Sequence, residues 1–350
     1  MNCPRLRLAA STLAFGATLA LGLSLATPAR AIDQALIDAA KKEGEVVWYT
    51  TVIIDQLVRP IASNFEKIYG IKVKYVRANA SDTALKIINE ARAGKVQADL
   101  FDGTSATPPL KDAGLVAKFL PEGAQALAPH YIDKDHQWIA THAYYMTPGY
   151  NTDLVPAKSA PKTFEDLLDP KWRGKMAWNS STSSSGGPGF VGNVLITMGE
   201  AKGMDYLKKL AGQNIINMDV SARQLLDQAI AGEFAIALQI FNHHAVISAK
   251  KGAPVSWVPI EPVTATLSVV SLLKAAPHPN AGKLLIEYMV SEEGQKLFEA
   301  ADYLPVHPKV KPRDPELTPE GGHFKVNVIS PETLGEKLPD WKKISDQLFR

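Results

Sequence analysis

The sequence is almost without cysteine. Its 350 residues contain one cysteine, Cys3, which lies in an N-terminal segment that we expect to be removed. A mature chain without cysteine forms no disulfide and offers no thiolate to a metal. It also has no cysteine nucleophile and no cysteine that could carry a lipid at a new N-terminus. These four classes of site are therefore excluded.

Long apolar runs and runs of one charge are also scarce. The one long apolar run, residues 8–25, follows Arg5 and Arg7 and precedes the small-x-small sequence Ala29–Ala31, as in a cleaved secretory signal peptide. A retained membrane anchor is the weaker interpretation, because Ser, Thr and Gly interrupt the run. Removing residues 1–31 takes away three of the 38 basic residues and none of the 36 acidic ones, which leaves a net charge near −1. Nucleic acid is therefore not an expected partner.

Helical and strand patterns alternate from residue 33 to residue 101. Leu57, Ile61 and Phe65 have the spacing of one helix face, and residues 71–75 alternate as a strand does. This order is typical of a sheet covered by helices. The roughly 319 residues after residue 31 are too many for one ordinary core. The sequence therefore predicts an α/β protein with two domains.

A buried strand predicted at 236–241 ends in polar residues. Asn242, His243 and His244 follow it, where a helical pattern over 242–250 begins. In open sheets of mostly parallel strands, ligands bind where the strands end. We therefore expect Asn242 and His243 to lie beside a ligand.

Other strand ends carry hydroxyls and glycines. A Ser/Gly-rich loop at 179–189 stands between a predicted strand and a helix, which suits an anion, although a flexible linker explains it equally well. Ser221 is expected to cap the next helix, from which Arg223 either reaches an anion or lies in solvent. The expected ligand-binding residues are Thr50, Thr51, Thr104, Ser105, Ser184, Ser185, Gly186, Ser221, Arg223, Asn242 and His243. Tyr49, Trp138 and Tyr144 are candidates for an aromatic wall, but isolated aromatics more often belong to a core.

Three spaced motifs carry a family resemblance. Residues 36–47, residues 161–175, and the pair 276–281 and 291–295 resemble segments of periplasmic solute-binding proteins of ABC importers. The likeness covers residues 33–308 and is nearest to the two-lobed group typified by ferric-iron-binding proteins, which includes phosphonate and thiamine binders. It is specific for the family and not for the ligand.

The resemblance implies a type II periplasmic-binding-protein fold, with mixed sheets flanked by helices and a ligand cleft between two lobes. The implied division is a signal peptide at 1–31, a first lobe at 32–143 and 259–302, and a second lobe at 144–258 and 303–350. Extended segments near 144–151 and 257–261 are expected to hinge the lobes. The implied role is that of a periplasmic monomer, neither an enzyme nor a cofactor carrier, that delivers a solute to an inner-membrane ABC permease.

The ligand follows less directly from the resemblance. Ferric members hold iron with a His after the first strand, a Glu after the third, and a Tyr-Tyr pair after an Asn. Here those places hold Thr50–Thr51, Thr104–Ser105 and Asn242–His243–His244, so no ferric ligand is retained. Imidazole suits softer divalent metals than Fe³⁺, and adjacent residues on a helix do not face one another.

We therefore expect a small organic or phosphonate-type anion. The alternative is a metal ion, iron(III) or divalent, held by His243 and His244. A secreted hydrolase is less favoured, because neither His-Glu-x-x-His nor Gly-x-Ser-x-Gly occurs.

Overall fold

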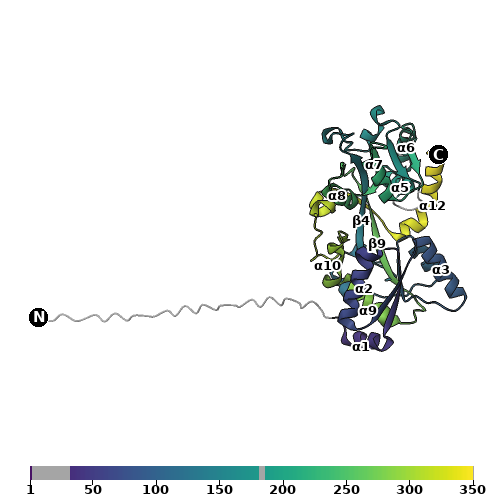
Figure 1. Ribbon diagram of the computed structural model, residues 1–350, viewed down its shortest axis with the longest axis vertical. Coiled ribbons are helices and arrows are strands. Elements are labelled where there is room, and N and C mark those ends of the chain that lie inside the picture. The colour runs from purple at the N-terminus through teal and green to yellow at the C-terminus, as the bar shows by residue number, and fades with distance from the viewer. Residues whose placement is uncertain (2–31, 181–185, 350) are drawn as a thin grey trace. The chain divides into compact units, whose positions relative to one another are not determined.

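The computed structural model describes Met1, residues 32–180 and residues 186–349 (Figure 1). The predicted signal peptide beyond Met1, and the predicted site residues Ser184 and Ser185, lie outside the described residues. In the part of the chain that is described, no helix combines the length and the apolar character needed to cross a membrane.

The first hundred residues form the predicted alternation of helices and strands. The elements are α1 (Gln34–Glu43), β1 (Glu45–Thr50), α2 (Arg59–Tyr69), β2 (Lys72–Arg77), α3 (Ala80–Arg92), β3 (Leu100–Asp102) and α4 (Thr107–Asp112). β1 pairs in parallel with both β2 and β3. Gly44 and Gly70 end α1 and α2 at φ values of 77° and 73°, a region that glycine enters without the steric cost of a Cβ.

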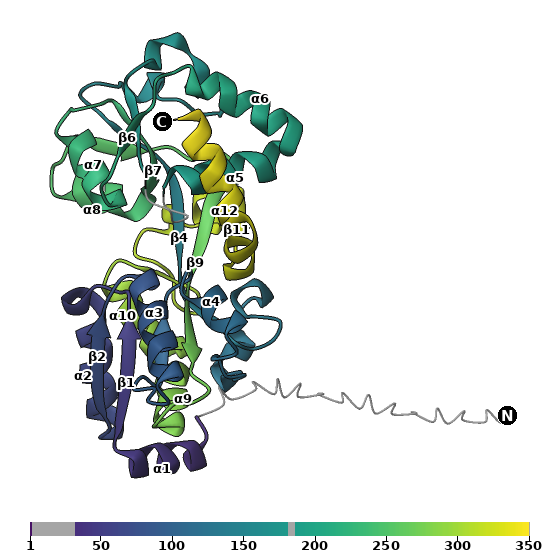
Figure 2. The same ribbon diagram turned by 90° about the vertical axis from the view of Figure 1, so that its right-hand side faces the viewer.

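Two long antiparallel strands run through the middle of the sheet. β4 (Ile139–Asn151) pairs with β9 (Val263–Leu272) from Ile139 opposite Val270 to Met146 opposite Thr264. The sheet order is β2-β1-β3-β9-β4-β7-β5-β6, so these two strands join the parallel strands at its two ends (Figures 1 and 2). The predicted extended segment ending at Asn151 is therefore confirmed. Every residue of β9 is buried, as expected of a strand covered on both faces.

The other end of the sheet repeats the parallel pattern. Its elements are β5 (Met176–Asn179), α5 (Gly187–Met198), α6 (Glu200–Ala211), β6 (Ile216–Met218), α7 (Ala222–Ile230), β7 (Ile236–Phe241) and α8 (Asn242–Lys250). β5 pairs in parallel with β6 and β7. α5 begins at Gly187, inside the loop predicted at 179–189, because Pro188 is accommodated in its first turn.

The C-terminal third adds helices and short pairing strands. They are β8 (Val255–Trp257), α9 (Pro279–Val290), α10 (Glu292–Ala300), β10 (Leu304–Pro305), α11 (Pro319–Gly322), β11 (Val326–Ile329) and α12 (Pro331–Leu348). β8 and β10 pair with β4, and β11 pairs with β9. α12 packs on α5 and, near its start, on α4 (Figure 2). The short helical turns are Ile54–Val58, Glu122–Ala126, Pro129–Tyr131, Ala157–Ser159, Glu165–Leu168, Pro170–Trp172 and Pro315–Leu317.

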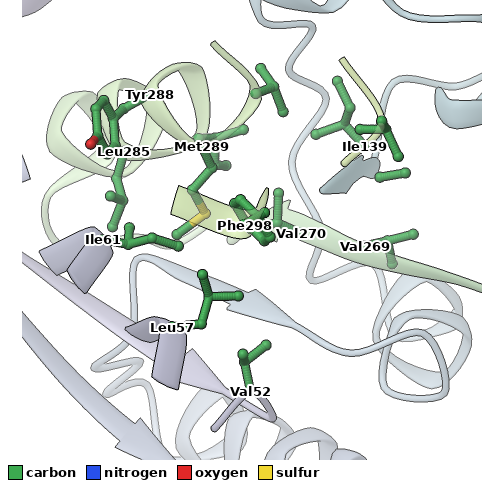
Figure 3. Close-up of a cluster of buried hydrophobic side chains, with 14 of the residues drawn as sticks. Val52, Leu57, Ile61, Ile139, Val269, Val270, Leu285, Tyr288, Met289 and Phe298 are labelled. Carbon is green, nitrogen blue, oxygen red and sulfur yellow. The ribbon is translucent and has the colours of Figure 1, made fainter. Parts of the chain in front are cut away.

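Two main hydrophobic clusters lie at the two ends of the sheet. The first cluster includes Val52, Leu57, Ile61, Ile139, Val269, Leu285, Tyr288 and Phe298 (Figure 3). The second cluster includes Trp178, Phe190, Leu207, Leu210 and Trp341. Each fully buried side chain of this size stabilises the fold by about 1.5–3 kcal/mol, so each end of the sheet has a core of its own.

The tail after residue 302 divides between these two clusters. Tyr303, Leu304, Val306, Leu317 and Phe324 pack in the first cluster, where β10 pairs with Ala143 and His142. Leu334, Trp341 and Phe349 pack in the second cluster. The lobe boundaries remain a prediction. They assign residues 303–324 to the second lobe, whereas this stretch packs in the first cluster, because β10 pairs with β4.

Candidate functional site

The predicted site residues lie at the ends of parallel strands, as the sequence indicated. Thr50 ends β1 and Thr51 follows it, and Thr104 and Ser105 follow β3. Gly186 precedes α5, and Ser221 precedes α7. Asn242 and His243 begin α8 directly after β7. Their hydrogen bonds within the protein show which of these side chains still have a polar group that could bind a ligand.

The hydroxyls after β1 are held by a buried carboxylate that the sequence reasoning missed. Asp102, at the end of β3, accepts hydrogen bonds from the Thr51 N–H (2.8 Å), the Thr51 hydroxyl (2.5 Å) and the Trp48 indole N–H (2.8 Å). Burial raises the pKa of Asp102, while these donors act in the opposite direction. The Thr50 hydroxyl accepts from the Val52 N–H at 3.1 Å. Both threonines therefore shape the loop through bonds within the protein.

Thr104 and Ser105 have different surroundings. The Thr104 hydroxyl donates to the Leu267 carbonyl of β9, which ties this loop to a central strand. Ser105 lines a cavity of about 320 Å³ between α4 and α12, together with Pro108, Leu334 and Leu338. Of this pair, Thr104 is therefore engaged within the fold, whereas Ser105 borders open space.

The backbone N–H groups at the start of α7 form hydrogen bonds with side chains of the same turn. Ser221 is the N-cap, as predicted, and forms a capping box in which its hydroxyl accepts from the Gln224 N–H and Gln224 accepts from the Ser221 N–H. Arg223 forms an ion pair with Asp227 at 2.5 Å and donates to the His244 carbonyl at 3.5 Å. Both interpretations of Arg223 stay open, since its side chain is half exposed and already balanced by a carboxylate.

α8 begins without a side-chain cap. Phe241 occupies the N-cap position, and its apolar side chain forms no cap hydrogen bond. Asn242 is fully buried; its side-chain oxygen accepts from the His243 N–H (2.8 Å), and its amide donates to the Leu317 carbonyl (2.9 Å). The Asn242 side chain therefore holds the C-terminal tail against α8, a role that the strand-end pattern did not indicate.

His243 and His244 each keep a buried ring nitrogen, Nδ1, without a hydrogen-bond partner among the described residues. His243 is 4% exposed, and burial lowers its pKa well below 6.5, with His244 as the next cause. Burial also lowers the pKa of His244, to about 4. Both rings are therefore neutral at neutral pH. Their centroids lie 4.3 Å apart, so these two neighbours do meet, contrary to the expectation from helix geometry.

An aromatic cluster surrounds His243, and the sequence reasoning recognised only part of it. The cluster consists of His142, Tyr144, Phe241, His243 and Tyr303. His142 and Tyr144 come from one face of β4 because they are two residues apart. The Tyr144 hydroxyl and His142 Nε2 are 2.6 Å apart. Tyr144 also stacks on His243, with ring centroids 6.0 Å apart.

The two other candidates for an aromatic wall lie elsewhere. Tyr49 packs in a separate cluster under α3 and donates its hydroxyl to Glu90 at 2.8 Å. Trp138 packs in the first cluster and donates its indole N–H to Glu332 at 2.7 Å. Of the three, Tyr144 therefore belongs to the aromatic cluster, because Tyr49 and Trp138 pack and hydrogen-bond elsewhere.

Arg77 is a cation near this cluster that the sequence reasoning missed. It ends β2, is exposed, and its Nε lies 3.4 Å from the Thr51 carbonyl. Its charge also lowers the pKa of Tyr303, although burial dominates and raises that pKa to about 12. In residues 32–180 and 186–349, no three His, Asp or Glu side chains come together in a way that would hold a metal ion. The sequence signal that could have identified Arg77 is its position at the end of the predicted strand that neighbours β1 and its threonines.

Comparisons with known proteins give one family. A model of bacterial extracellular solute-binding proteins matches residues 61–324. A putative 2-aminoethylphosphonate-binding periplasmic protein of Salmonella paratyphi A is 25% identical over 296 residues, covering 81% of this chain and 82% of that protein. The Fe(3+)-binding periplasmic protein of Serratia marcescens is 25% identical over 316 residues, covering 84% and 85%.

Solved structures agree on the fold. Iron-bound HitA of Pseudomonas aeruginosa matches with a TM-score of 0.71 at 23% identity, over 87% of this chain and 99% of that chain. At this identity the likeness shows the fold alone. It confirms the predicted α/β fold of two-lobed periplasmic binding proteins.

Proposed function

Because the chain belongs to the bacterial extracellular solute-binding proteins, we propose that it captures a small organic or phosphonate-type anion in the periplasm and delivers it to an ABC permease. Members of this family bind solutes for transport and are not enzymes. We further propose that the protein acts as a monomer without a cofactor, and that its two lobes close on the ligand about residues 144–151 and 257–261.

The buried, unpartnered Nδ1 of His243 is the observation that carries the proposal. Leaving a buried polar atom without a hydrogen bond costs about 1–3 kcal/mol, so most such atoms in proteins have a partner. His243 also stands in the first turn of α8, where the N-cap residue Phe241 makes no side-chain cap bond and Asn242 accepts from the His243 N–H alone. A ligand with an anionic oxygen would accept hydrogen bonds from a neutral imidazole N–H and from this helix end.

The charges near the aromatic cluster support an anion. Arg77 is exposed beside Thr51, whereas the nearby carboxylate of Asp102 already accepts three hydrogen bonds from Trp48 and Thr51. A solute entering here would therefore meet an available cation and a carboxylate that is occupied. The likeness to the Salmonella protein, whose name specifies 2-aminoethylphosphonate, supports the same class of ligand.

A metal ion remains the second candidate, and the likeness to the Fe(3+)-binding protein of Serratia favours it. The close approach of the His243 and His244 rings also permits a shared ion. Neutral imidazole nitrogens suit a divalent ion better than Fe³⁺, which prefers phenolate and carboxylate oxygen.

A thermal-shift screen of the purified protein against phosphonates, organic phosphates, carboxylates and metal ions separates the two candidates. We expect an anion to raise the melting temperature, since a ligand present at a hundred times its Kd adds about 2.7 kcal/mol of stability. EDTA should leave this stabilisation unchanged. If a metal is the ligand, EDTA abolishes it.

Calorimetry on histidine variants then tests the site itself. His243→Ala should weaken anion binding by about 1–3 kcal/mol, the range for a lost buried hydrogen bond, and His244→Ala should weaken it less. His136→Asn, which replaces an exposed histidine outside the aromatic cluster, is the matched control. Wild-type affinity in both His243→Ala and His244→Ala would contradict the site.

Small-angle scattering tests the proposed closure. The radius of gyration should fall when the ligand identified in the screen saturates the protein, as in other hinge-closing proteins. An unchanged radius with saturating ligand would count against the hinge at residues 144–151 and 257–261.

A further inference from the structure

A cavity distinct from the one beside Ser105 lies on the face of β4 opposite the aromatic cluster. It has a volume of about 490 Å³, and its walls are the turn at Ala128–Tyr131, Tyr145 of β4, and the tail between Pro305 and Gly321. Tyr145 follows Tyr144 on β4, and successive side chains of a strand point to opposite faces. The cavity is therefore separate from the aromatic cluster, and the residues that line it include none of the predicted site residues.

The walls of this cavity are held in one core. Tyr145 and Val306 are buried in the first cluster, and Tyr131 packs against it. Phe324 meets the Tyr145 ring edge-on at 5.8 Å, and β10 pairs Leu304 and Pro305 with β4. Each of the three walls therefore has a residue in the first cluster or packed against it.

The lining suits a flat, mostly apolar molecule. Two tyrosines, Tyr131 and Tyr145, and four prolines of the tail, Pro305, Pro308, Pro312 and Pro315, are among the lining residues. Cavities that bind small molecules are usually about 300–1,000 Å³ and lined by apolar and aromatic side chains with a few polar groups. An aromatic ring would fit between these tyrosines by offset or edge-on packing.

The charges at the rim of the cavity indicate one negative charge on the ligand. Lys311 is exposed and has no ion-pair partner among the residues that the structure describes. The exposed His130 lies beside it in the lining, with its ring 4.1 Å from that of Tyr131. Glu320 lines the same cavity and would repel a second negative charge.

We propose that this cavity is a second ligand site, which binds a small aromatic monocarboxylate. The ring lies against Tyr131, Tyr145 and the prolines of the tail, and the carboxylate pairs with Lys311. The proposal does not rest on the function proposed above, because it uses a different face of β4 and none of the same residues.

Benzoate is the probe, titrated into the purified protein by calorimetry, with saturation-transfer NMR to detect weak binding. We expect saturable binding at one site per chain. Benzyl alcohol, which has the same ring without the charge, should bind about tenfold more weakly, because a charge-assisted hydrogen bond is lost.

Variants locate the probe in the cavity. Lys311→Gln should weaken benzoate about tenfold, whereas Lys309→Gln should not, since Lys309 is an exposed lysine of the same tail outside the lining. Ala128→Phe, which fills the cavity and leaves both tyrosines and Lys311 in place, should abolish binding. His243→Ala should leave benzoate binding unchanged.

Three results would overturn the proposal. The first is the absence of saturable benzoate binding by the wild-type protein. The second is equal affinity of Lys311→Gln and Lys309→Gln. The third is loss of benzoate binding in His243→Ala, which would place the probe at the strand ends. A protein that fails every test of the strand-end site but binds benzoate as described still supports the second site.

Discussion

His142 and His243 are two buried histidines beside the same tyrosine, and their ring nitrogens have opposite surroundings. His142 meets the Thr141 hydroxyl at 3.0 Å and the Tyr144 hydroxyl at 2.6 Å, so both nitrogens are used within the fold. His243 keeps Nδ1 without a hydrogen-bond partner in residues 32–180 and 186–349. Both histidines are buried, so burial does not distinguish a structural histidine from a candidate ligand residue. The hydrogen bonds of the ring nitrogens make this distinction.

The same distinction applies to the other predicted site residues. Asn242, Thr51, Thr104 and Ser221 all use their side chains within the protein, as His142 does. Ser105 and His243 have polar groups that are not engaged in this way. The predictions that follow test whether partnered groups act on stability and unpartnered groups act on binding.

The largest expected effect is on the pH dependence of stability. Burial lowers the pKa of His142 to about 3 and of His244 to about 4, and lowers that of His243 as well. The unfolded chain binds a proton at each of these histidines near pH 6.5, whereas the folded chain does not. Stability present above pH 6.5 should therefore fall between pH 6.5 and 5, by up to about 1.4 kcal/mol per pH unit for each histidine.

Urea unfolding across this pH range measures the effect, and two variants sharpen it. His142→Phe and His243→Phe should each reduce the slope of the unfolding free energy against pH by up to about 1.4 kcal/mol per pH unit. Each variant removes one histidine that takes up a proton only on unfolding. An unchanged slope in either variant would show that the histidine it replaces is protonated in the folded protein.

The next effect separates the two histidines at pH 7.5. His142→Phe leaves the partly buried Tyr144 hydroxyl without its partner and should lower the free energy of unfolding by about 1–3 kcal/mol. His243→Phe removes an unpartnered nitrogen and should change it by less than about 0.5 kcal/mol. Urea unfolding of both variants without ligand provides the comparison. Equal destabilisation would mean that His243 also has a structural partner.

The smallest effect concerns Ser221. Ser221→Ala removes the capping box of α7 and should cost about 1 kcal/mol of stability. Affinity for the ligand found in the screen should stay within about twofold of wild type, since the hydroxyl is already bonded to Gln224. Calorimetry that finds a larger loss of affinity would return Ser221 to the list of ligand residues.

Much of the fold was predictable because its signals are local. The alternation through α1, β1, α2, β2, α3 and β3 follows from apolar spacing and from the glycines that end helices. The position of α8 directly after β7 follows from the break between Phe241 and Asn242. α12 was not predicted, although Leu334, Leu338 and Trp341 have helical spacing; Pro339 lies inside it, and the helix depends on packing against α5.

Local sequence patterns were enough to predict the order of helices and strands, the strand ends at which polar residues gather, and the family to which the chain is similar. Which of those polar residues lack a partner within the described protein follows from contacts between distant segments. Asn242 bonds to Leu317, 75 residues away, and Thr51 bonds to Asp102, 51 residues away. No local pattern records such pairs, because hydrogen-bond partners at strand ends come from segments that the fold, and not the sequence, makes neighbours.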